Sequence, residues 1–153
     1  MTAAFTWQVR VYYEDTDAGG IVFYANYLKF FERARTEWLR SGGIDQSTLA
    51  KEQDIAFVVM RTSVDYHCPA TLDNELKLSV MVERHGRASV DFIQEAWRDH
   101  NTGAAPTLIA TGRIKVACVN RHDLRPRPLP ESVCRFIQDT FEQTTLEQST
   151  HVD

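Results

Sequence analysis

The chain has 153 residues, of which 43% are hydrophobic and 25% are charged. This usage is typical of a single globular domain and excludes a disordered or fibrous protein. The formal net charge of −4 argues against a protein whose main partner is nucleic acid. No run approaches the about 18 consecutive apolar residues of a membrane span, and the first residues lack the basic start and apolar run of a signal peptide. We therefore expect a cytoplasmic protein without a membrane-spanning segment.

The cysteines and histidines do not have the spacing of a metal site or of a disulfide framework. Cys68, Cys118 and Cys134 are odd in number and widely separated, so we expect reduced thiols. The five histidines are scattered and include no i, i+4 pair. We expect neither a metal ion nor a cofactor.

The hydrophobic period changes once in the first third of the chain. Apolar and polar residues alternate over Phe5–Tyr13, which predicts a half-buried strand with its odd-numbered residues on the inner face. Residues 14–20 are rich in acidic residues and glycine and predict a loop. Over Tyr24–Arg40 the apolar side chains recur at helical spacing, and Gly42 and Gly43 end this helix. The stripe that we expect to pack against a sheet contains Tyr27, Phe31, Ala34 and Trp38.

A short helix and several strands are predicted after the long helix. Asp45 is the predicted N-cap of a helix that runs toward Lys51. Period-two alternation and turn residues then predict four strands, which cover Phe57–His67, Glu75–His85, Arg87–Arg98 and Thr107–Asn120. Their short connections predict an antiparallel meander from residue 75 onward.

Three prolines near residue 128 stop the last strand, and Pro130 suits the first turn of a closing helix that reaches Phe141. The polar residues 142–153 are expected to form a disordered tail. These elements predict an α+β fold in one domain, residues 1–141, in which an antiparallel sheet covers one long helix.

The densest polar cluster is Glu14-Asp15-Thr16-Asp17, immediately before the long helix. Acids at this place can cap the helix and complement the positive end of its dipole. The same geometry also suits acyl chemistry, because unpaired N–H groups at a helix start can stabilise an oxyanion and a nearby carboxylate can act on the carbonyl carbon. Spacing alone leaves both interpretations open for Asp15 and for Asp17.

A long motif identifies a family. The run YYEDTDAGGIVFYANYLKFFERARTEWLR, residues 12–40, resembles the signature of hotdog-fold acyl-CoA thioesterases. It is most similar to the YbgC-type branch, associated with the Tol-Pal cell-envelope system, within the 4-hydroxybenzoyl-CoA thioesterase family. The resemblance continues through AFVV at 56–59, VDYHCPA at 64–70 and LRPRPLP at 124–130, and so covers the chain to about Phe141.

The resemblance implies a hotdog fold, a five-stranded antiparallel sheet wrapped around one long central helix. It implies a homodimer, or a tetramer made of two dimers, with acyl-CoA sites at the subunit interface. Asp17 matches the catalytic carboxylate of the family, as nucleophile or as general base, and the Tyr24 backbone N–H matches the oxyanion donor. Many YbgC-type members have histidine where this chain has Tyr24, so a histidine-assisted mechanism is not expected here.

Two basic groups are candidate contacts for the phosphates of CoA, because the arginine fork donates bidentately to phosphate. Arg84, Arg87 and Ser89 bracket the turn at residue 86 in a region that approaches CoA in family members, and Arg125 and Arg127 follow the last strand. A solvated surface explains any one of these residues equally well. By the resemblance, the acyl or pantetheine channel is lined by Val58, Val59 and Met60, although an ordinary strand core also explains them.

The expected function is hydrolysis of an acyl-CoA thioester to the free acid and CoA, which enters as part of the substrate rather than as a cofactor. The alternative is a catalytically weak adaptor that binds an acyl-carrier protein or a lipid-synthesis partner. A hotdog dehydratase is disfavoured because it would need a histidine near the loop and long helix, and none precedes His67.

Overall fold

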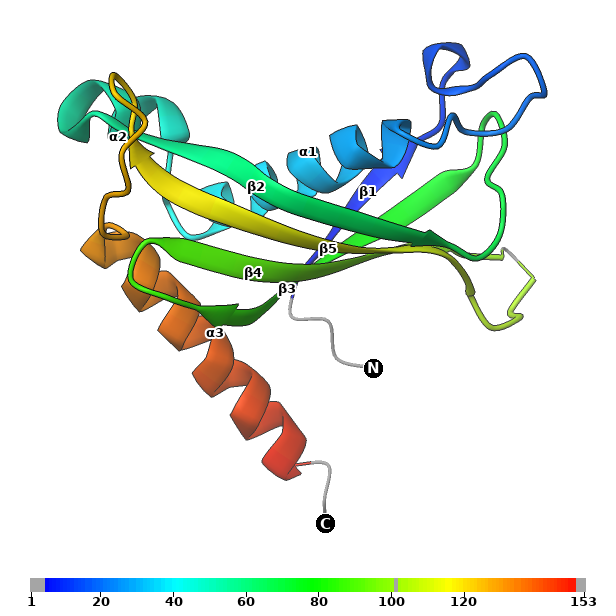
Figure 1. Ribbon diagram of the computed structural model, residues 1–153. Helices are drawn as coiled ribbons and strands as arrows, with labels where there is room; N and C mark the ends of the chain where they lie inside the picture. The colour runs from blue at the N-terminus through cyan, green and yellow to red at the C-terminus, as the bar shows by residue number, and fades with distance from the viewer. Residues whose placement is uncertain (1–4, 101, 151–153) are drawn as a thin grey trace.

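The computed structural model describes residues 5–100 and 102–150, with side chains as far as residue 141. It is an α+β hotdog fold in which one antiparallel sheet of five strands curves around a long helix (Figure 1). The elements in chain order are β1 (Phe5–Arg10), the 3₁₀ turn η1 (Tyr13–Asp15), α1 (Asn26–Ser41), α2 (Gln46–Gln53), β2 (Ile55–Tyr66), β3 (Glu75–His85), β4 (Ser89–Arg98), β5 (Thr107–Asn120) and α3 (Glu131–Thr150).

The sheet confirms the predicted meander. Its strand order is β1-β3-β4-β5-β2, and every neighbouring pair is antiparallel. The bounds of β3 and β5 are those predicted from the alternation of their side chains. β2 pairs with β5 on one side only, so it is an edge strand within the described chain. Its register slips at a bulge between Val59 and Arg61.

Helix α1 buries its apolar stripe against the concave face of the sheet. Tyr27, Phe31 and Trp38 are all buried, which confirms their predicted place in the core. Phe31 lies over Gly112 of β5, where a β-carbon would come within 2.8 Å of the phenyl ring. The absence of a side chain at this glycine is therefore what allows the helix to approach the sheet so closely.

The predicted N-terminal strand is longer than the observed one. β1 ends at Arg10, and the inner-face pattern fails for Trp7 and Tyr13, which are exposed. The chain leaves the sheet because the carboxylate of Asp15 accepts the Tyr12 N–H, which closes the turn η1. Helix α1 likewise begins at Asn26 rather than at residue 24, because residues 24 and 25 form a turn.

The connections carry the predicted second helix and a longer closing helix. Asp45 caps α2 as predicted, with its carboxylate accepting the Ser47 N–H. α3 begins just after Pro130, and its backbone is helical to Thr150, through most of the stretch predicted as a polar tail. Residues 151–153 of that predicted tail lie outside the described residues. Within the described chain, none of the helices has the length and apolar character that a membrane crossing requires.

Candidate active site

Asp15 is a structural residue of the loop between β1 and α1. Its side chain is buried and accepts two hydrogen bonds, from the Tyr12 backbone N–H at 2.8 Å and from the Asn26 side-chain amide at 2.9 Å. Its carbonyl oxygen also accepts the Phe23 N–H. Asp15 therefore fixes the shape of the loop against the first turn of α1, and its carboxylate is fully engaged in doing so.

Asp17 has the opposite environment, although it lies only two residues further along. The residue is exposed, and one carboxylate oxygen accepts the Gly19 N–H at 2.8 Å. A β-carbon at Gly19 would lie 3.2 Å from this oxygen, so the small residue keeps the turn close. The second carboxylate oxygen has no partner among the described residues and faces solvent.

The residues before α1 present unpaired backbone donors. Neither Tyr24 nor Ala25 donates its N–H to another group in the described chain. The Tyr24 carbonyl is held by the Tyr66 hydroxyl at 2.7 Å, and the Tyr24 side chain is 64% exposed. The helix start thus combines a fixed backbone with free N–H groups and the positive end of the helix dipole, an arrangement suited to an anionic oxygen.

Tyr66 was not singled out from the sequence, and its neighbour Tyr27 was predicted only as a core residue of the helix. Their rings contact each other at 5.7 Å between centroids, and burial raises the pKa of Tyr27 to about 12. Both hydroxyls are therefore neutral donors at physiological pH. The alternation in β2 could have indicated that Tyr66 faces the helix, but its partner lies 42 residues away and no local pattern predicts that bond.

The predicted basic residues near the β3–β4 turn are divided between two places. Arg84 forms an ion pair with Asp91 at 2.8 Å across the two strands, and Asp91 raises the pKa of Arg84 further. Arg87 lies in the turn itself, is exposed, and accepts the Leu129 N–H at its carbonyl. Ser89 is the first residue of β4 and is half-buried. The backbone of Arg87 is thus bonded to the loop that carries Arg125 and Arg127, whereas the side chain of Arg84 is paired with Asp91.

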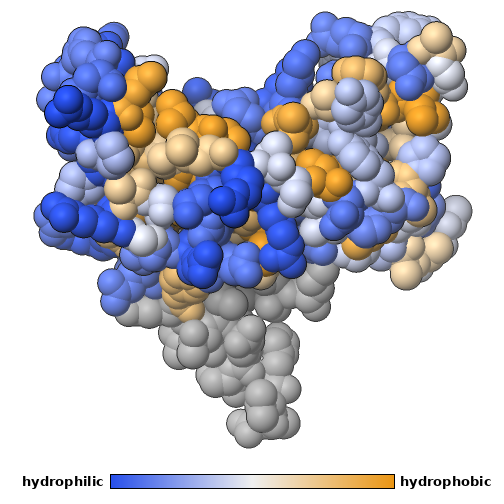
Figure 2. All heavy atoms as spheres, viewed as in Figure 1, coloured by the Kyte–Doolittle hydropathy of each residue, from blue (hydrophilic) through white to orange (hydrophobic). Residues whose placement is uncertain are grey.

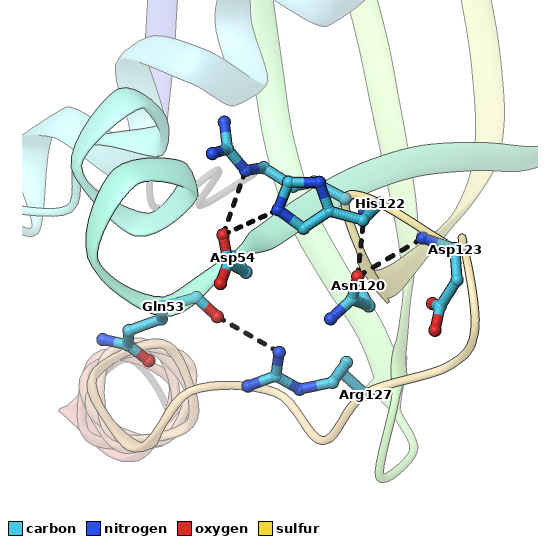
Figure 3. A network of polar contacts seen from close by, with 7 residues as sticks. Gln53, Asp54, Asn120, His122, Asp123 and Arg127 are labelled. Carbon is cyan, nitrogen blue, oxygen red and sulfur yellow. Dashed lines mark hydrogen bonds and ion pairs between the residues drawn. The ribbon is translucent and has the colours of Figure 1, made fainter.

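The second basic group lies on the loop between β5 and α3, which is held onto the corner between α2 and β2 (Figure 3). Arg127 donates to the Gln53 carbonyl at 3.1 Å, which fixes its guanidinium at the end of α2. Asp54, the left-handed residue that ends α2, binds the side chains of Arg121 and His122, each at 3.1 Å. These two donors lower the pKa of the Asp54 carboxyl, His122 more than Arg121.

Arg125 belongs to the same loop but has no such anchor. The residue is exposed, its N–H donates to the Asp123 carboxylate, and its carbonyl accepts the Asn120 N–H. Arg87, Arg125 and Arg127 therefore form one basic surface, which we call the basic corner. The structure brings together two groups that are about 40 residues apart in sequence.

The basic corner and Asp17 lie at opposite ends of the molecule. The loop of Asp17 is fastened near the end of β2 by Tyr66 and by the Val22 N–H, which donates to Ala70. The basic corner adjoins Gln53 and Asp54, just before β2 begins. The 12 residues of β2 span about 40 Å at roughly 3.3 Å per residue, so one chain does not place both sets of residues at one site.

An apolar groove runs between α1 and the edge strand β2, and apolar side chains are exposed in the hollow between the raised ends of the face in Figure 2. It contains two adjoining cavities of about 120 and 360 Å³ that share Glu32, Arg35 and Val59 in their walls. Of the three predicted channel residues, only Val59 lines this groove. Val58 faces the other side of the sheet because successive strand residues alternate, and Met60 is exposed at the bulge.

No cluster of three or more histidine, cysteine or acidic side chains with the arrangement of a metal site occurs among the described residues. The three cysteines have free thiols, and burial raises the pKa of the Cys118 thiol.

The chain is similar in sequence to known proteins over most of its length. Residues 19–105 match the thioesterase superfamily. The chain is 42% identical over 132 residues to the acyl-CoA thioester hydrolase YbgC of Escherichia coli O6:H1, covering 86% of this chain and 94% of that protein. It is 44% identical over 129 residues to the acyl-CoA thioesterase YbgC of Haemophilus influenzae, covering 84% and 90%.

Solved structures share the fold. A gentisyl-coenzyme A thioesterase is 26% identical with a TM-score of 0.74, covering 84% of this chain and 98% of that one. A mutant 4-hydroxybenzoyl-CoA thioesterase complexed with 4-hydroxybenzoyl-CoA is 19% identical with a TM-score of 0.79, covering 87% and 97%, a likeness of fold alone.

Proposed function

The chain belongs to the thioesterase superfamily and, within it, to the YbgC-type acyl-CoA thioester hydrolases, and on this premise we propose that Asp17 and the Tyr24 backbone N–H carry out the hydrolysis. The single observation that supports this assignment is the division between two neighbouring acids. Both carboxylate oxygens of Asp15 accept hydrogen bonds within the protein, whereas one carboxylate oxygen of Asp17 has no partner among the described residues. Only the second can approach a substrate.

The chemistry follows from the charges at the site. The thioester carbonyl oxygen lies against the Tyr24 N–H, where the helix dipole stabilises the negative charge that develops on it. The free oxygen of Asp17 attacks the carbonyl carbon, or takes a proton from a water that attacks it. The carbon–sulfur bond then breaks, and the sulfur leaves as the thiolate of CoA and takes up a proton. After direct attack the acyl group is held on Asp17 as a mixed anhydride, which a water cleaves to release the acid and restore the carboxylate. After attack by water the acid is released directly, and Asp17 gives up the proton that it took. No metal or cofactor enters these steps.

The active unit is a homodimer, or a tetramer of two such dimers. β2 offers a row of unpaired N–H and C=O groups at the edge of the sheet, with Val59 and Met60 exposed on it. Exposed edges of this kind favour pairing with another strand. Antiparallel pairing of two β2 strands about a twofold axis would continue the sheet across both subunits.

This pairing also explains why Asp17 and the basic corner lie at opposite ends of one chain. In an antiparallel pair, the end of one β2 adjoins the beginning of the other. Asp17 of one subunit then lies on the same side as the basic corner of its partner, whose Arg87, Arg125 and Arg127 are suited to the phosphates of CoA. Each site is built from both chains.

Replacement of the free carboxylate tests the assignment. Asp17→Asn keeps the acceptor for the Gly19 N–H but removes the charge, and we expect kcat with a panel of acyl-CoAs to fall about 10²- to 10⁴-fold. Released thiol reports the rate, and circular dichroism reports the fold. The matched control is Glu14→Gln, an exposed acid in the same loop, which should retain its activity. Hydrolysis at the wild-type rate by Asp17→Asn would remove Asp17 from the mechanism.

A complementation experiment tests the shared site. Asp17→Asn and Arg87→Glu/Arg125→Glu are each expected to be nearly inactive alone, the second through a raised KM for CoA thioesters. Mixed dimers of the two contain one site with neither defect, so co-expression should restore activity. Failure of the mixture to exceed its parents would contradict a site made by two chains. A wild-type protein that hydrolyses no acyl-CoA of any length but retains an acyl-carrier protein on a column would instead support the adaptor function.

A further inference from the structure

A polar pair, one residue buried and the other half-buried, lies between α1 and the sheet, away from Asp17. Gln94 of β4 is fully buried, and its amide N–H₂ donates to the backbone carbonyls of Phe31 at 3.0 Å and Ser79 at 3.4 Å. With both donors directed at carbonyls, the amide oxygen must face the other way. It accepts a hydrogen bond of 2.9 Å from the guanidinium of Arg35.

The guanidinium of Arg35 lies beside an aromatic ring and forms no ion pair with an acidic side chain of the described chain. Its guanidinium carbon lies 5.9 Å from the centre of the Phe92 ring, and burial lowers its pKa. Arg35 is half-buried, and no carboxylate of the described chain forms an ion pair with it. Glu32, one turn earlier on the helix, acts only by longer-range attraction, and its carboxylate accepts the Thr36 hydroxyl instead.

The remaining donors of Arg35 are open to the groove. A guanidinium has five N–H donors, and the structure engages one of them with Gln94. No buried side-chain nitrogen among the described residues lacks a partner, so the other nitrogens of Arg35 must be accessible. The accessible side is the groove, because Arg35 lines both of its cavities together with Val59 and apolar residues such as Phe57 and Ile114.

We propose that Arg35, positioned by Gln94, is a specificity-determining residue that binds a carboxylate at the far end of the acyl group. This inference rests on the proposed function, since it takes the groove as the acyl site. The preferred substrates are then CoA monothioesters of aliphatic dicarboxylic acids, with an apolar chain against the groove walls and a terminal carboxylate that receives two N–H donors from the planar fork. Lys29 also lines the groove, and its positive charge offsets the negative charge of Glu32, which lines both cavities.

The distance along α1 between the proposed oxyanion donor and Arg35 limits the length of acyl group that can reach both. Asn26, where α1 begins, and Arg35 are nine positions apart, which is about 13.5 Å along the axis at roughly 1.5 Å per residue, and Tyr24 lies two residues before the helix. The arginine side chain spans part of this distance, and the acyl group must span the rest. A dicarboxylic acyl group of medium length fits better than a very short one.

Matched substrate pairs test the proposal. The pairs are succinyl-CoA with butyryl-CoA, adipyl-CoA with hexanoyl-CoA, and suberyl-CoA with octanoyl-CoA, which differ within each pair by the terminal carboxylate. For the wild type we expect kcat/KM to favour the carboxylated member, most strongly in the longest pair. Arg35→Met retains the packing over Phe92 and should shift the ratio of kcat/KM values toward the neutral member by about 10- to 100-fold.

The controls separate this proposal from a structural role and from the mechanism. Arg33→Met, an exposed arginine on the same helix, should leave the ratio unchanged. Arg35→Lys keeps the charge but loses the planar fork, so it should keep only part of the preference. An unchanged ratio in Arg35→Met that still hydrolyses the neutral substrates would overturn the role of Arg35 without touching that of Asp17, which is tested by loss of all hydrolysis.

A measurement on the wild-type enzyme alone keeps the test independent of folding. Suberate and octanoate are compared as competitive inhibitors, and suberate should bind at least tenfold more tightly. Tighter inhibition by octanoate would contradict the proposal.

Discussion

The Tyr66 hydroxyl donates a 2.7 Å hydrogen bond to the backbone carbonyl of Tyr24, and so joins the last residue of β2 to the turn that precedes α1. This hydrogen bond fixes the backbone at Tyr24, where the N–H groups of Tyr24 and Ala25 are without acceptors in the described chain. It also links the edge strand, where a second subunit would pair, to the proposed oxyanion donor. The position of that donor thus depends on the sheet as well as on the helix.

Tyr66→Phe removes this hydroxyl but keeps the ring that contacts Tyr27. We expect the free energy of unfolding in urea to fall by about 0.5–1.5 kcal/mol, the usual net value of one hydrogen bond. Because the turn is then less well fixed, kcat should fall several-fold while KM changes less. Equal kcat in the variant and the wild type would show that the bond does not position the donor.

The two acids before α1 should differ in their effect on stability. Asp15→Ala leaves the Tyr12 N–H and the Asn26 amide without their acceptor in a buried place, which is expected to cost about 2–4 kcal/mol. Asp17→Asn should change the unfolding free energy by less than about 0.5 kcal/mol, since the residue is exposed and the Gly19 contact can persist. Urea melts of both variants measure the contrast. Similar losses in the two would contradict the division of roles.

Gly112 should not tolerate a side chain. A β-carbon there would lie 2.8 Å from the Phe31 ring, at the centre of the contact between β5 and α1. We expect Gly112→Ala to destabilise the protein by about 1–3 kcal/mol through overpacking. Gly86→Ala is the control, because its nearest neighbour, the Ser89 hydroxyl, is 3.4 Å away. Thermal unfolding of the two variants provides the comparison.

The corner in Figure 3 should give a pH-dependent contribution to stability. The His122 and Arg121 side chains lower the pKa of Asp54 in the folded state. A lowered carboxyl pKa stabilises the fold at pH values above the unfolded pKa of about 3.9, and this contribution is lost as the pH falls through the folded value. Asp54→Asn tolerates the left-handed backbone, so its Tm should lie below that of the wild type near neutral pH and converge with it in acid. A difference that stays constant with pH would contradict the ion pair as its source.

Local patterns in the sequence determined most of the fold. The bounds of β3 and β5, the apolar stripe of α1 and the cap at Asp45 all follow from the period of side chains or from the chemistry of one helix end. The motif over residues 12–40 also identified the family, because residues of one loop and one helix are contiguous. Even so, the sequence could not choose between the roles of Asp15 and Asp17, since both have the same charge and nearly the same place.

The tertiary structure decided which residues meet. It buried Asp15 and left Asp17 exposed. It also joined Arg87 to the loop of Arg127, and placed these two arginines at the opposite end of the molecule from Asp17. Strand alternation and the bulge in β2 left Val59 as the one predicted channel residue that lines the groove. Arg35 and Gln94 are 59 residues apart, and their contact depends on how a helix crosses a sheet. Periodicity reports which face of an element is buried, but a contact between two elements depends on their register and crossing, which only the packed chain fixes.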